Sequence, residues 1–280
     1  MGIVNYGRGF SGPKVVMSQQ DVIEGVRIQG RVLVALMLRE ARTRYGRRQA
    51  GYLWALVEPI MHVTMFVIIF TYLARPIPLG HSVPMFLATG IATYLGFRNV
   101  MSRTQGGYGS NEALLSFPIV KVLDCFIGRA LLELATWLAV SIVIIGSLVA
   151  MGEGSLPRSP ITMLSAIIAL AAIGFGVGVC LGIIGEFLPS LDSLLKLPMR
   201  FLYFLSAVFY LPDQLPPVAR DVLQWNPIVH GITLFRMGYY HLYDSHIFSG
   251  LYLLGWAVCS VLMALLIERI ARKPLRNMSG

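Results

Sequence analysis

Hydrophobic residues are gathered into six long segments, which are separated by short polar or proline-rich connections. A bilayer core about 30 Å thick is crossed by about 20 helical residues, because each residue of an α-helix advances 1.5 Å. Five of the segments reach this length with no more than two charged residues each. The pattern predicts an all-α integral membrane protein with six transmembrane helices, at about residues 52–74, 84–104, 128–151, 160–185, 191–211 and 246–268.

The fifth segment is the weakest of the six. Its uncharged stretch, residues 201–212, would be only about 18 Å long as a helix. It crosses the bilayer only if the helix begins near Leu191 and includes Lys196 and Arg200. A cation at the bilayer centre costs about 2.5–3.5 kcal/mol, but a cation near a helix end can extend to the headgroups. We therefore expect a span that carries these two cations near one end.

The composition agrees with a membrane environment. Of the 280 residues, 56% are hydrophobic and 13% are charged, whereas soluble domains carry about 25% charged residues. The net charge of +9 does not indicate a nucleic-acid partner, because the basic residues stand at the ends of apolar runs, as at a membrane surface. The three cysteines and five histidines lack the spacing of a metal site, so we expect no metal or other cofactor in this chain.

The basic residues also orient the chain. With both termini in the cytoplasm, 19 of the 23 lysines and arginines lie in cytoplasmic ends and loops, as the positive-inside rule requires. Residues 1–30 and 273–280 then become cytoplasmic tails of a transmembrane domain at 31–272. Residues 31–48, apolar and then basic, are expected to form a helix in the headgroup layer. Residues 212–245 are expected to form extracytoplasmic re-entrant helices, since irregular backbone inside a bilayer must be buried in protein or line a wet cavity.

The sequence shows no arrangement typical of catalysis. Residues 7–12 (GRGFSG) spell GxGxxG but follow no predicted strand, and no GxxxxGK[ST] phosphate-binding loop occurs. Glu58 and Glu133 lie in apolar segments, where either proton coupling or a structural ion pair with a nearby arginine would explain them, and we favour the ion pair. Three glycines at four-residue spacing predict close helix packing: Gly174, Gly178 and Gly182.

Three groups of residues are candidates for function, and the first is a basic cluster before the first span. Its members are Arg39, Arg42, Arg44, Arg47 and Arg48. They lie where the phosphate of a lipid would sit, and guanidinium groups suit phosphate oxygens. Anchoring and orienting the chain is the alternative role.

The second group is a predicted short helix at residues 110–118 (SNEALLSFP), which begins at Ser110 or Asn111 and is stopped by a proline. It is either a surface turn or a docking helix for a cytoplasmic partner. In the second case the docking residues are Asn111, Glu112, Leu114, Leu115, Phe117 and Pro118.

The third group is aromatic and follows the cationic start of the fifth span. Its members are Phe201, Tyr203, Phe204, Phe209, Tyr210 and Trp225. On one continuous helix Tyr203 and Tyr210 would share a side, because they are seven residues apart. Aromatic rings can pack against the apolar faces of sugars, so these residues could line a path for a sugar chain. An aromatic belt at the membrane surface is an equally open interpretation.

These groups belong to blocks that resemble a known family. The chain resembles the permease subunits of ABC-2 type polysaccharide exporters, most closely the capsular polysaccharide (KpsM-like) branch. The resemblance lies in residues 38–63 (LREARTRYGRRQAGYLWALVEPIMHV), 110–124 (SNEALLSFPIVKVLD), 197–216 (LPMRFLYFLSAVFYLPDQLP) and 225–236 (WNPIVHGITLFR).

The resemblance implies a non-catalytic permease that works as a homodimer in the bacterial inner membrane. It implies two copies of a separate cytoplasmic ATPase, which would hold the ATP and magnesium, and a lipid-linked polysaccharide as the substrate. A periplasmic co-polymerase and an outer-membrane channel are further expected partners. Family permeases have an interfacial helix, a coupling helix and re-entrant helices, which correspond here to residues 31–48, 110–118 and 212–245.

Other classes of protein fit the sequence less well. An ABC-2 exporter of O-antigen or teichoic acid is the nearest alternative, because these branches grade into the capsule branch. A secondary transporter usually has internal repeats, which the sequence lacks. A membrane enzyme would need a metal-binding or phosphate-binding motif, which is also absent.

Overall fold

The computed structural model describes residues 19–45, 50–111, 120–188 and 190–278, and within these ranges all regular structure is helical. The helices are α1 (Gln19–Tyr45), α2 (Ala50–Tyr72), α3 (Val83–Gln105), η1 (Gly109–Asn111), α5 (Val122–Ala150), α6 (Pro160–Phe187), α7 (Leu191–Phe204), η2 (Pro212–Gln214), α8 (Pro217–Leu223), α9 (Pro227–Tyr239) and α10 (Gly250–Met278).

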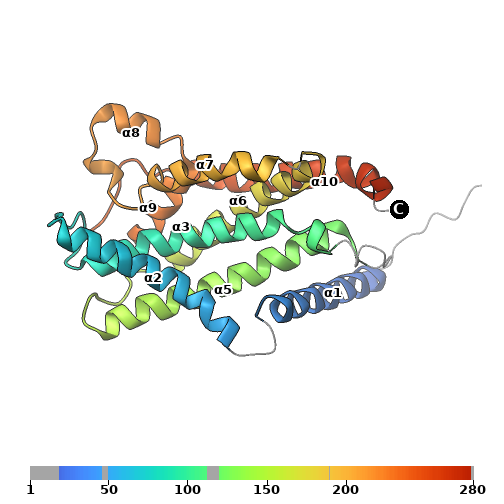
Figure 1. Ribbon diagram of the computed structural model, residues 1–280, viewed down its shortest axis with the longest axis horizontal. Helices are drawn as coiled ribbons and strands as arrows, with labels where there is room; N and C mark the ends of the chain where they lie inside the picture. The colour runs from blue at the N-terminus through green and yellow to red at the C-terminus, as the bar shows by residue number, and fades with distance from the viewer. Residues whose placement is uncertain (1–18, 46–49, 112–119, 189, 279–280) are drawn as a thin grey trace, which may run out of the picture.

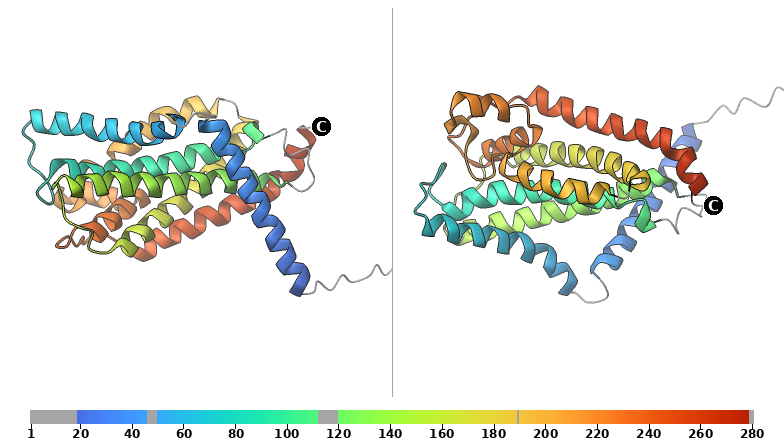
Figure 2. Two further views of the ribbon diagram at one scale, coloured as in Figure 1. Left: turned by 90° about the horizontal axis from the view of Figure 1, so that it is seen from below. Right: turned by 45° about the horizontal axis from the view of Figure 1, so that its top comes forward.

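The long helices run side by side along one axis of the molecule (Figure 1). α8 and α9 lie at one end of this bundle, which we call the outer end. α1 lies at the opposite end, which we call the base, and crosses the bundle at an angle (Figure 2). Within the described residues, four helical stretches are long and apolar enough to cross a membrane: Leu53–Tyr72, Val122–Ala150, Pro160–Phe187 and Gly250–Arg272. The prediction of a multi-span, all-helical membrane protein is confirmed at this level.

α3 is the central helix of the bundle. It packs against α2, α5, α6 and α9, and most of its residues from Met85 to Phe97 are buried. Its buried Thr89 and Thr93 donate their hydroxyl hydrogens to carbonyl oxygens of the same helix, at 2.8 and 2.7 Å. Because protein surrounds α3, it needs less hydrophobic surface than a lipid-facing span. This explains why a helix of 23 residues, about 34 Å long, is not among the four apolar stretches.

The glycines of α6 let it approach α3 closely. A Cβ atom would lie 2.5 Å from the carbonyl oxygen of Met101 if it were added at Gly178, and 2.5 Å from that of Gln105 if added at Gly182. At Gly174 the corresponding distance to the Phe97 oxygen is 3.0 Å. The close packing predicted from the glycine spacing is therefore confirmed, with α3 as the partner.

The helix predicted at residues 191–211 is shorter than expected. α7 ends at Phe204 after 14 residues, about 21 Å, and Ala207 has a φ of +58°. A continued helix would need an N–H at residue 212 to bond the carbonyl of Val208, and Pro212 has none. The carbonyl of Val208 bonds to the guanidinium group of Arg236 instead. The expectation that Tyr203 and Tyr210 share one side of a helix is consequently wrong.

The two ends of the chain are more helical than predicted. α1 begins at Gln19, so residues 19–30 of the predicted N-terminal tail belong to this helix. α10 continues to Met278, into the predicted C-terminal tail. In both cases the helix extends beyond the apolar stretch from which its ends were predicted.

Candidate functional site

At the base, α1 lies against the N-terminal half of α5. Leu36 of α1 is buried, and a Cβ atom added at Gly128 of α5 would lie 3.2 Å from the Cβ of Leu36. The missing side chain at Gly128 thus allows α1 to come close. This approach brings the polar side chains of α1 within reach of η1 and α5.

Three pairs of polar side chains then join α1 to the rest of the base. Arg39 Nη1 donates to Asn111 Oδ1 at 2.9 Å. Arg129 Nη2 forms an ion pair with Glu40 Oε1 at 2.8 Å, and Gln29 Nε2 donates to Asp124 Oδ1. We call these six residues the base clamp: Gln29, Arg39, Glu40, Asn111, Asp124 and Arg129.

The partners of α1 in the base clamp are themselves fixed by the backbone. Asn111 Nδ2 donates to the carbonyl oxygen of Gly107 at 2.9 Å, and Arg129 Nη1 donates to that of Gly106 at 2.6 Å. Asp124 Oδ2 accepts a hydrogen bond from the backbone N–H of Lys121 at 3.0 Å. The clamp therefore links α1 to both sides of the connection between α3 and α5.

The base clamp brings together two residues that were predicted in separate groups, Arg39 and Asn111. Arg42 is exposed, Arg44 lies in α1, and Arg47 and Arg48 lie outside the described residues. The remaining docking residues also lie outside the described residues: Glu112, Leu114, Leu115, Phe117 and Pro118. Sequence analysis missed Glu40, Asp124 and Arg129 as members of a common site, because their pairing depends on how α1 crosses the bundle.

Three of the predicted aromatic residues form one cluster with rings from α2 and α3. The ring centroids of Tyr203 and Phe209 are 5.1 Å apart, and those of Phe204 and Phe209 are 5.7 Å apart. Phe66 of α2 lies 4.4 Å from Phe209, and Tyr94 of α3 lies 4.7 Å from Tyr203. Further members, not predicted as such, are His62 and Phe70. The four-residue spacing of His62, Phe66 and Phe70 is a sequence signal that could have indicated them.

The other three predicted aromatic residues lie outside this cluster of rings. Phe201 and Trp225 are exposed by 59% and 70%. Tyr210 donates its hydroxyl hydrogen to the carbonyl oxygen of Phe204 at 2.9 Å. The structure thus divides the predicted group into three rings that contact one another and three that have no ring contact with them; Tyr210 among the latter is half-buried.

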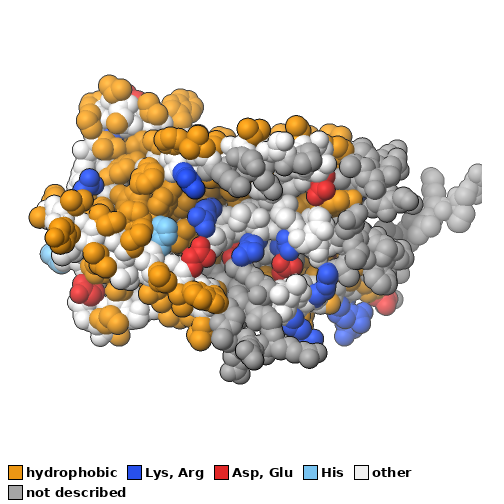
Figure 3. Space-filling view, in the orientation of Figure 1, with side chains coloured by type: hydrophobic (Ala, Val, Ile, Leu, Met, Phe, Trp, Pro, Cys, Tyr) orange, Lys and Arg blue, Asp and Glu red, His pale blue; other side chains and the backbone are white. Residues whose placement is uncertain are grey.

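One face of the molecule carries charge in its middle, next to the hydrophobic side chains of the outer end (Figure 3). Arg98 of α3 forms an ion pair with Glu58 of α2 at 3.3 Å, and the two side chains are 41% and 55% exposed. The ion pair expected for Glu58 is therefore present, with Arg98 as its partner. A groove of about 810 Å³ continues toward the base between α3, α6 and α7, and polar side chains including Ser102 and Gln105 line it.

The outer end is organised by Arg236 of α9, which is 1% exposed. Its guanidinium group donates to the carbonyl oxygens of Ala207 (2.7 Å), Val208 (2.7 Å) and Tyr210 (3.1 Å) and lies 4.3 Å above the ring of Phe86. Burial lowers the pKa of Arg236 to about 10, so that it remains charged at neutral pH. Arg236 therefore fixes the irregular segment that follows α7.

Two more side chains bind backbone at the outer end: the half-buried Asn226 and the buried His230. Asn226 Nδ2 donates to the carbonyl oxygen of Leu205 at 3.1 Å. His230 Nδ1 accepts from the backbone N–H of Ser249 at 3.1 Å, so its Nε2 carries the hydrogen that is shared with the Gln224 oxygen at 2.8 Å. Burial lowers the pKa of His230 below 6.5, in keeping with this neutral form. In the described part of the chain no group of His, Cys, Asp and Glu could hold a metal ion.

The comparison with known proteins identifies the family. Residues 31–240 match the family described as ABC-2 type transporter. This chain belongs to the ABC-2 type transporter family. The matched segment includes the aromatic cluster, Arg236 and every residue of the base clamp except Gln29.

Relatives of this ABC-2 chain include named transport proteins. It is 29% identical to the polysialic acid transport protein KpsM of Escherichia coli over 251 residues, which cover 90% of this chain and 97% of the relative. It is 34% identical to the capsule polysaccharide export inner-membrane protein CtrC of Neisseria meningitidis serogroup B, over 78% of this chain and 82% of the relative. The O-antigen export system permease protein RfbA of Klebsiella pneumoniae is more distant, with 21% identity over 73% of this chain and 78% of the relative.

Proposed function

We propose that this chain is the permease subunit of an ATP-driven exporter, which moves lipid-linked capsular polysaccharide across the bacterial inner membrane. The observation that carries the proposal is the similarity to KpsM over 90% of this chain and 97% of the relative. The lower identity to RfbA favours capsular polysaccharide over O-antigen as the substrate.

The charged middle of one face supports assembly as a homodimer. Charged side chains that face lipid are costly, so they are normally covered by protein or line a water-filled path. Glu58, Arg98 and the groove beside α3 lie on such a face, between apolar helices. A second copy of the chain over this face would cover the charges and enclose a polar path for a sugar chain.

The fold is compatible with six membrane crossings and cytoplasmic termini. In the part of the chain that the structure describes, four helical stretches are long and apolar enough to span, and α3 is long enough and lies among them. α7 and the segment after it, up to residue 211, would make the remaining crossing, because Arg236 satisfies its non-helical carbonyls within the protein. α8 and α9 would then be re-entrant helices on the periplasmic side, and the base would face the cytoplasm.

The base suits contact with an ATPase subunit. Residues 110–118 are part of the connection between α3 and α5, and Asn111 within them is bonded to Arg39 of α1, so a partner that displaces this segment would also displace α1. Two copies of the ATPase, which hold ATP and magnesium, would dock on the two copies of this chain. Periplasmic co-polymerase and outer-membrane partners would act beyond the outer end.

The remaining predicted residues would contact the substrate. Arg42, Arg44, Arg47 and Arg48 would bind the phosphate of the lipid-linked glycan, whereas Arg39 is engaged with Asn111. The aromatic cluster around Tyr203 and Phe209 would support the sugar chain by weak contacts with its C–H faces. Anchoring at the membrane surface is the alternative for both groups.

Deletion of the gene followed by complementation tests the function. We expect the deletion strain to accumulate capsular polymer inside the cell and to lose it from the surface, and the intact gene to restore export. Leu115→Asp should block export while the protein is still inserted, because a charge would lose its hydration inside a docking interface. Normal surface polymer in the deletion strain would overturn the proposal, and internal accumulation of O-antigen instead of capsule would reassign the substrate.

A further inference from the structure

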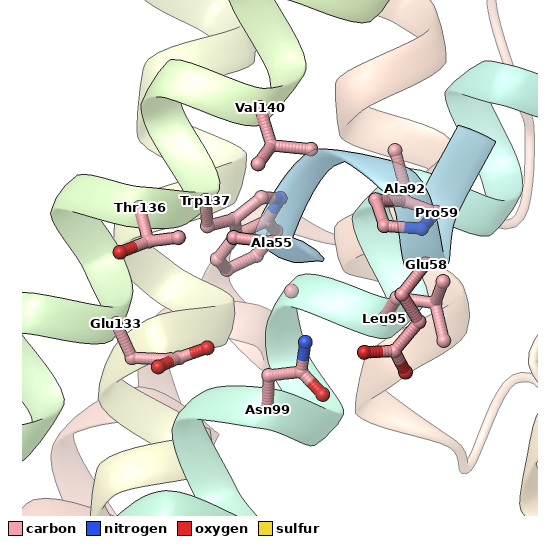
Figure 4. Close-up of a pocket in the computed structure, with 11 residues that line it drawn as sticks. Ala55, Glu58, Pro59, Ala92, Leu95, Asn99, Glu133, Thr136, Trp137 and Val140 are labelled. Atoms are coloured by element: carbon pink, nitrogen blue, oxygen red, sulfur yellow. The ribbon is translucent and has the colours of Figure 1, made fainter. Parts of the chain in front are cut away.

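A small cavity lies between α2, α3 and α5, near the ion pair of Glu58 and Arg98. Its volume is about 30 Å³, and residues from all three helices line it, among them Ala55, Asn99 and Trp137 (Figure 4). One water molecule needs about 10–15 Å³ measured in this way. The cavity therefore has room for two or three water molecules.

Trp137 presents a buried donor to this cavity. Its side chain is 4% exposed, and its Nε1–H has no hydrogen-bond partner in the described part of the chain. The ring cannot easily turn away, since it lies against Gly96 of α3, where an added Cβ atom would come within 2.0 Å of the indole. A buried N–H group without a partner costs free energy, so a water molecule at this position would be stabilising.

α2 presents a matching acceptor. Pro59 lies inside this helix and has no N–H, so the carbonyl of Ala55, four residues earlier, has no helical donor. Ala55 and Pro59 both line the cavity. The polar side chains of Asn99 and Glu133 also line it, and in Figure 4 they lie below the indole ring. Donor and acceptor thus lie on two different helices around a space that is large enough for water.

We propose that this cavity is a water-binding site, in which water accepts from Trp137 Nε1–H and donates to the carbonyl of Ala55. The water bridge makes α2 a hinge at Pro59. A water molecule can keep its hydrogen bonds while the helix bends, whereas a direct helical hydrogen bond would be broken by the bend. α2 is suited to such bending: only 17% of its spanning stretch is buried, compared with 44% and 56% for the stretches of α5 and α6.

A double-mutant cycle tests the bridge on purified protein in lipid nanodiscs, by the midpoint of thermal unfolding. Trp137→Phe removes the N–H and keeps the ring, and we expect it to lower the midpoint by about 2–4 °C. Pro59→Ala gives the carbonyl of Ala55 a helical N–H and displaces the water from it. In a chain that already carries Pro59→Ala, Trp137→Phe should therefore leave the unfolding midpoint unchanged or raise it.

Two matched variants control for the substitutions themselves. Trp225→Phe changes an indole that is 70% exposed, and Pro198→Ala changes a proline inside α7, away from the cavity. Neither should couple to the hinge variants. If Trp137→Phe has no effect, or has the same effect with Pro59 as with Ala at that position, the two groups share no water and the proposal is overturned.

A second measurement does not depend on the stability of the variants. In protein labelled with ¹⁵N-tryptophan, the indole signal that disappears in Trp137→Phe should show magnetisation transfer from water. An indole signal without any transfer from water would contradict a water site. Neither measurement depends on export. Failure of the water-site proposal can therefore be distinguished from failure of the proposed function.

Discussion

The base and the outer end of this transporter chain are held together in different ways. At the base, side chains pair with side chains, as Glu40 does with Arg129, and these two retain 18% and 12% exposure. At the outer end, buried side chains bind backbone carbonyls, as Arg236 does while it is 1% exposed. Because both side chains of this pair retain some contact with water, the pair separates at a lower cost than fully buried groups do. A buried carbonyl has no such contact with water.

The difference indicates a division of work between the two ends. The base can exchange its pairs when a partner moves, and it carries the segment proposed to meet the ATPase. At the outer end, the backbone after α7 is held in one conformation, next to the aromatic cluster. Substitutions at the outer end should therefore reduce stability, whereas substitutions at the base should reduce coupled transport.

The largest effect is expected from Arg236→Met. The substitution leaves three buried carbonyls without a donor, at residues 207, 208 and 210, and should cost more than about 3 kcal/mol of stability. Little folded protein should be recovered in the membrane fraction. Arg158→Met, at an exposed arginine near the same end, is the control and should be recovered normally. Equal recovery of the two variants would show that Arg236 is not needed to stabilise the segment after α7.

Next in size is a loss of coupling on breaking the base clamp. Glu40→Lys replaces the ion pair with Arg129 by repulsion, and should cost about 1–3 kcal/mol of stability because both side chains are largely buried. Export should fall at least several-fold while ATP hydrolysis by the assembled complex continues. Glu24→Lys, at an exposed position of the same helix, should leave export unchanged. Normal export in Glu40→Lys would show that the base does not need this pair.

A smaller effect is expected from the aromatic residues near the outer end. Tyr203→Leu removes a flat ring in contact with Phe209 and should slow export of the polymer without loss of assembled protein. Trp225→Leu should slow export less, because Trp225 lies outside the cluster. Pulse-labelling of the polymer gives the two rates, and equal rates would favour an aromatic belt over a sugar path.

The smallest predicted effect is a pH dependence from His230. Burial holds its pKa below 6.5 in the folded protein, so the unfolded chain takes up the proton first as the pH falls. Stability should therefore decrease as the pH is lowered below about 6.5, down to the folded pKa. His230→Gln keeps a donor toward the Gln224 oxygen and should flatten this dependence between pH 7 and 5. If stability depends on pH in His230→Gln as it does in the unaltered protein, another group is responsible for the dependence.

The sequence predicted the helices better than it predicted their contacts. Apolar segments of about 20 residues indicated the spanning helices, and the glycines of α6 indicated close packing. The end of α7 was missed because the bond from Arg236 to the Val208 carbonyl joins residues 28 positions apart. Pro212 was the local signal that a helix could not continue unchanged.

The candidate site was only partly predictable for the same reason. Arg39 and Asn111 were each selected from local patterns, but their contact spans 72 positions and depends on the angle of α1. Glu40 and Arg129 carry no pattern that distinguishes them from other surface charges. Phe66 and His62 join the aromatic cluster only because α2 lies beside the end of α7.

The most direct test of the division between the two ends is a comparison of two cross-links during transport. In a chain whose Cys125, Cys180 and Cys259 are replaced by Ala, one variant carries Glu40→Cys with Arg129→Cys, and a second carries Asp213→Cys with Ser245→Cys. Ser245 donates to Asp213 at 2.9 Å at the outer end. A short thiol-reactive linker joins each pair, and a reducing agent releases it.

We predict that the base cross-link stops export and that reduction returns export to the level of the same variant before linking, because the base must rearrange in each transport cycle. The outer cross-link should leave export close to the level of the unlinked variant. Export that continues with the base linked, or stops with only the outer end linked, would contradict the account.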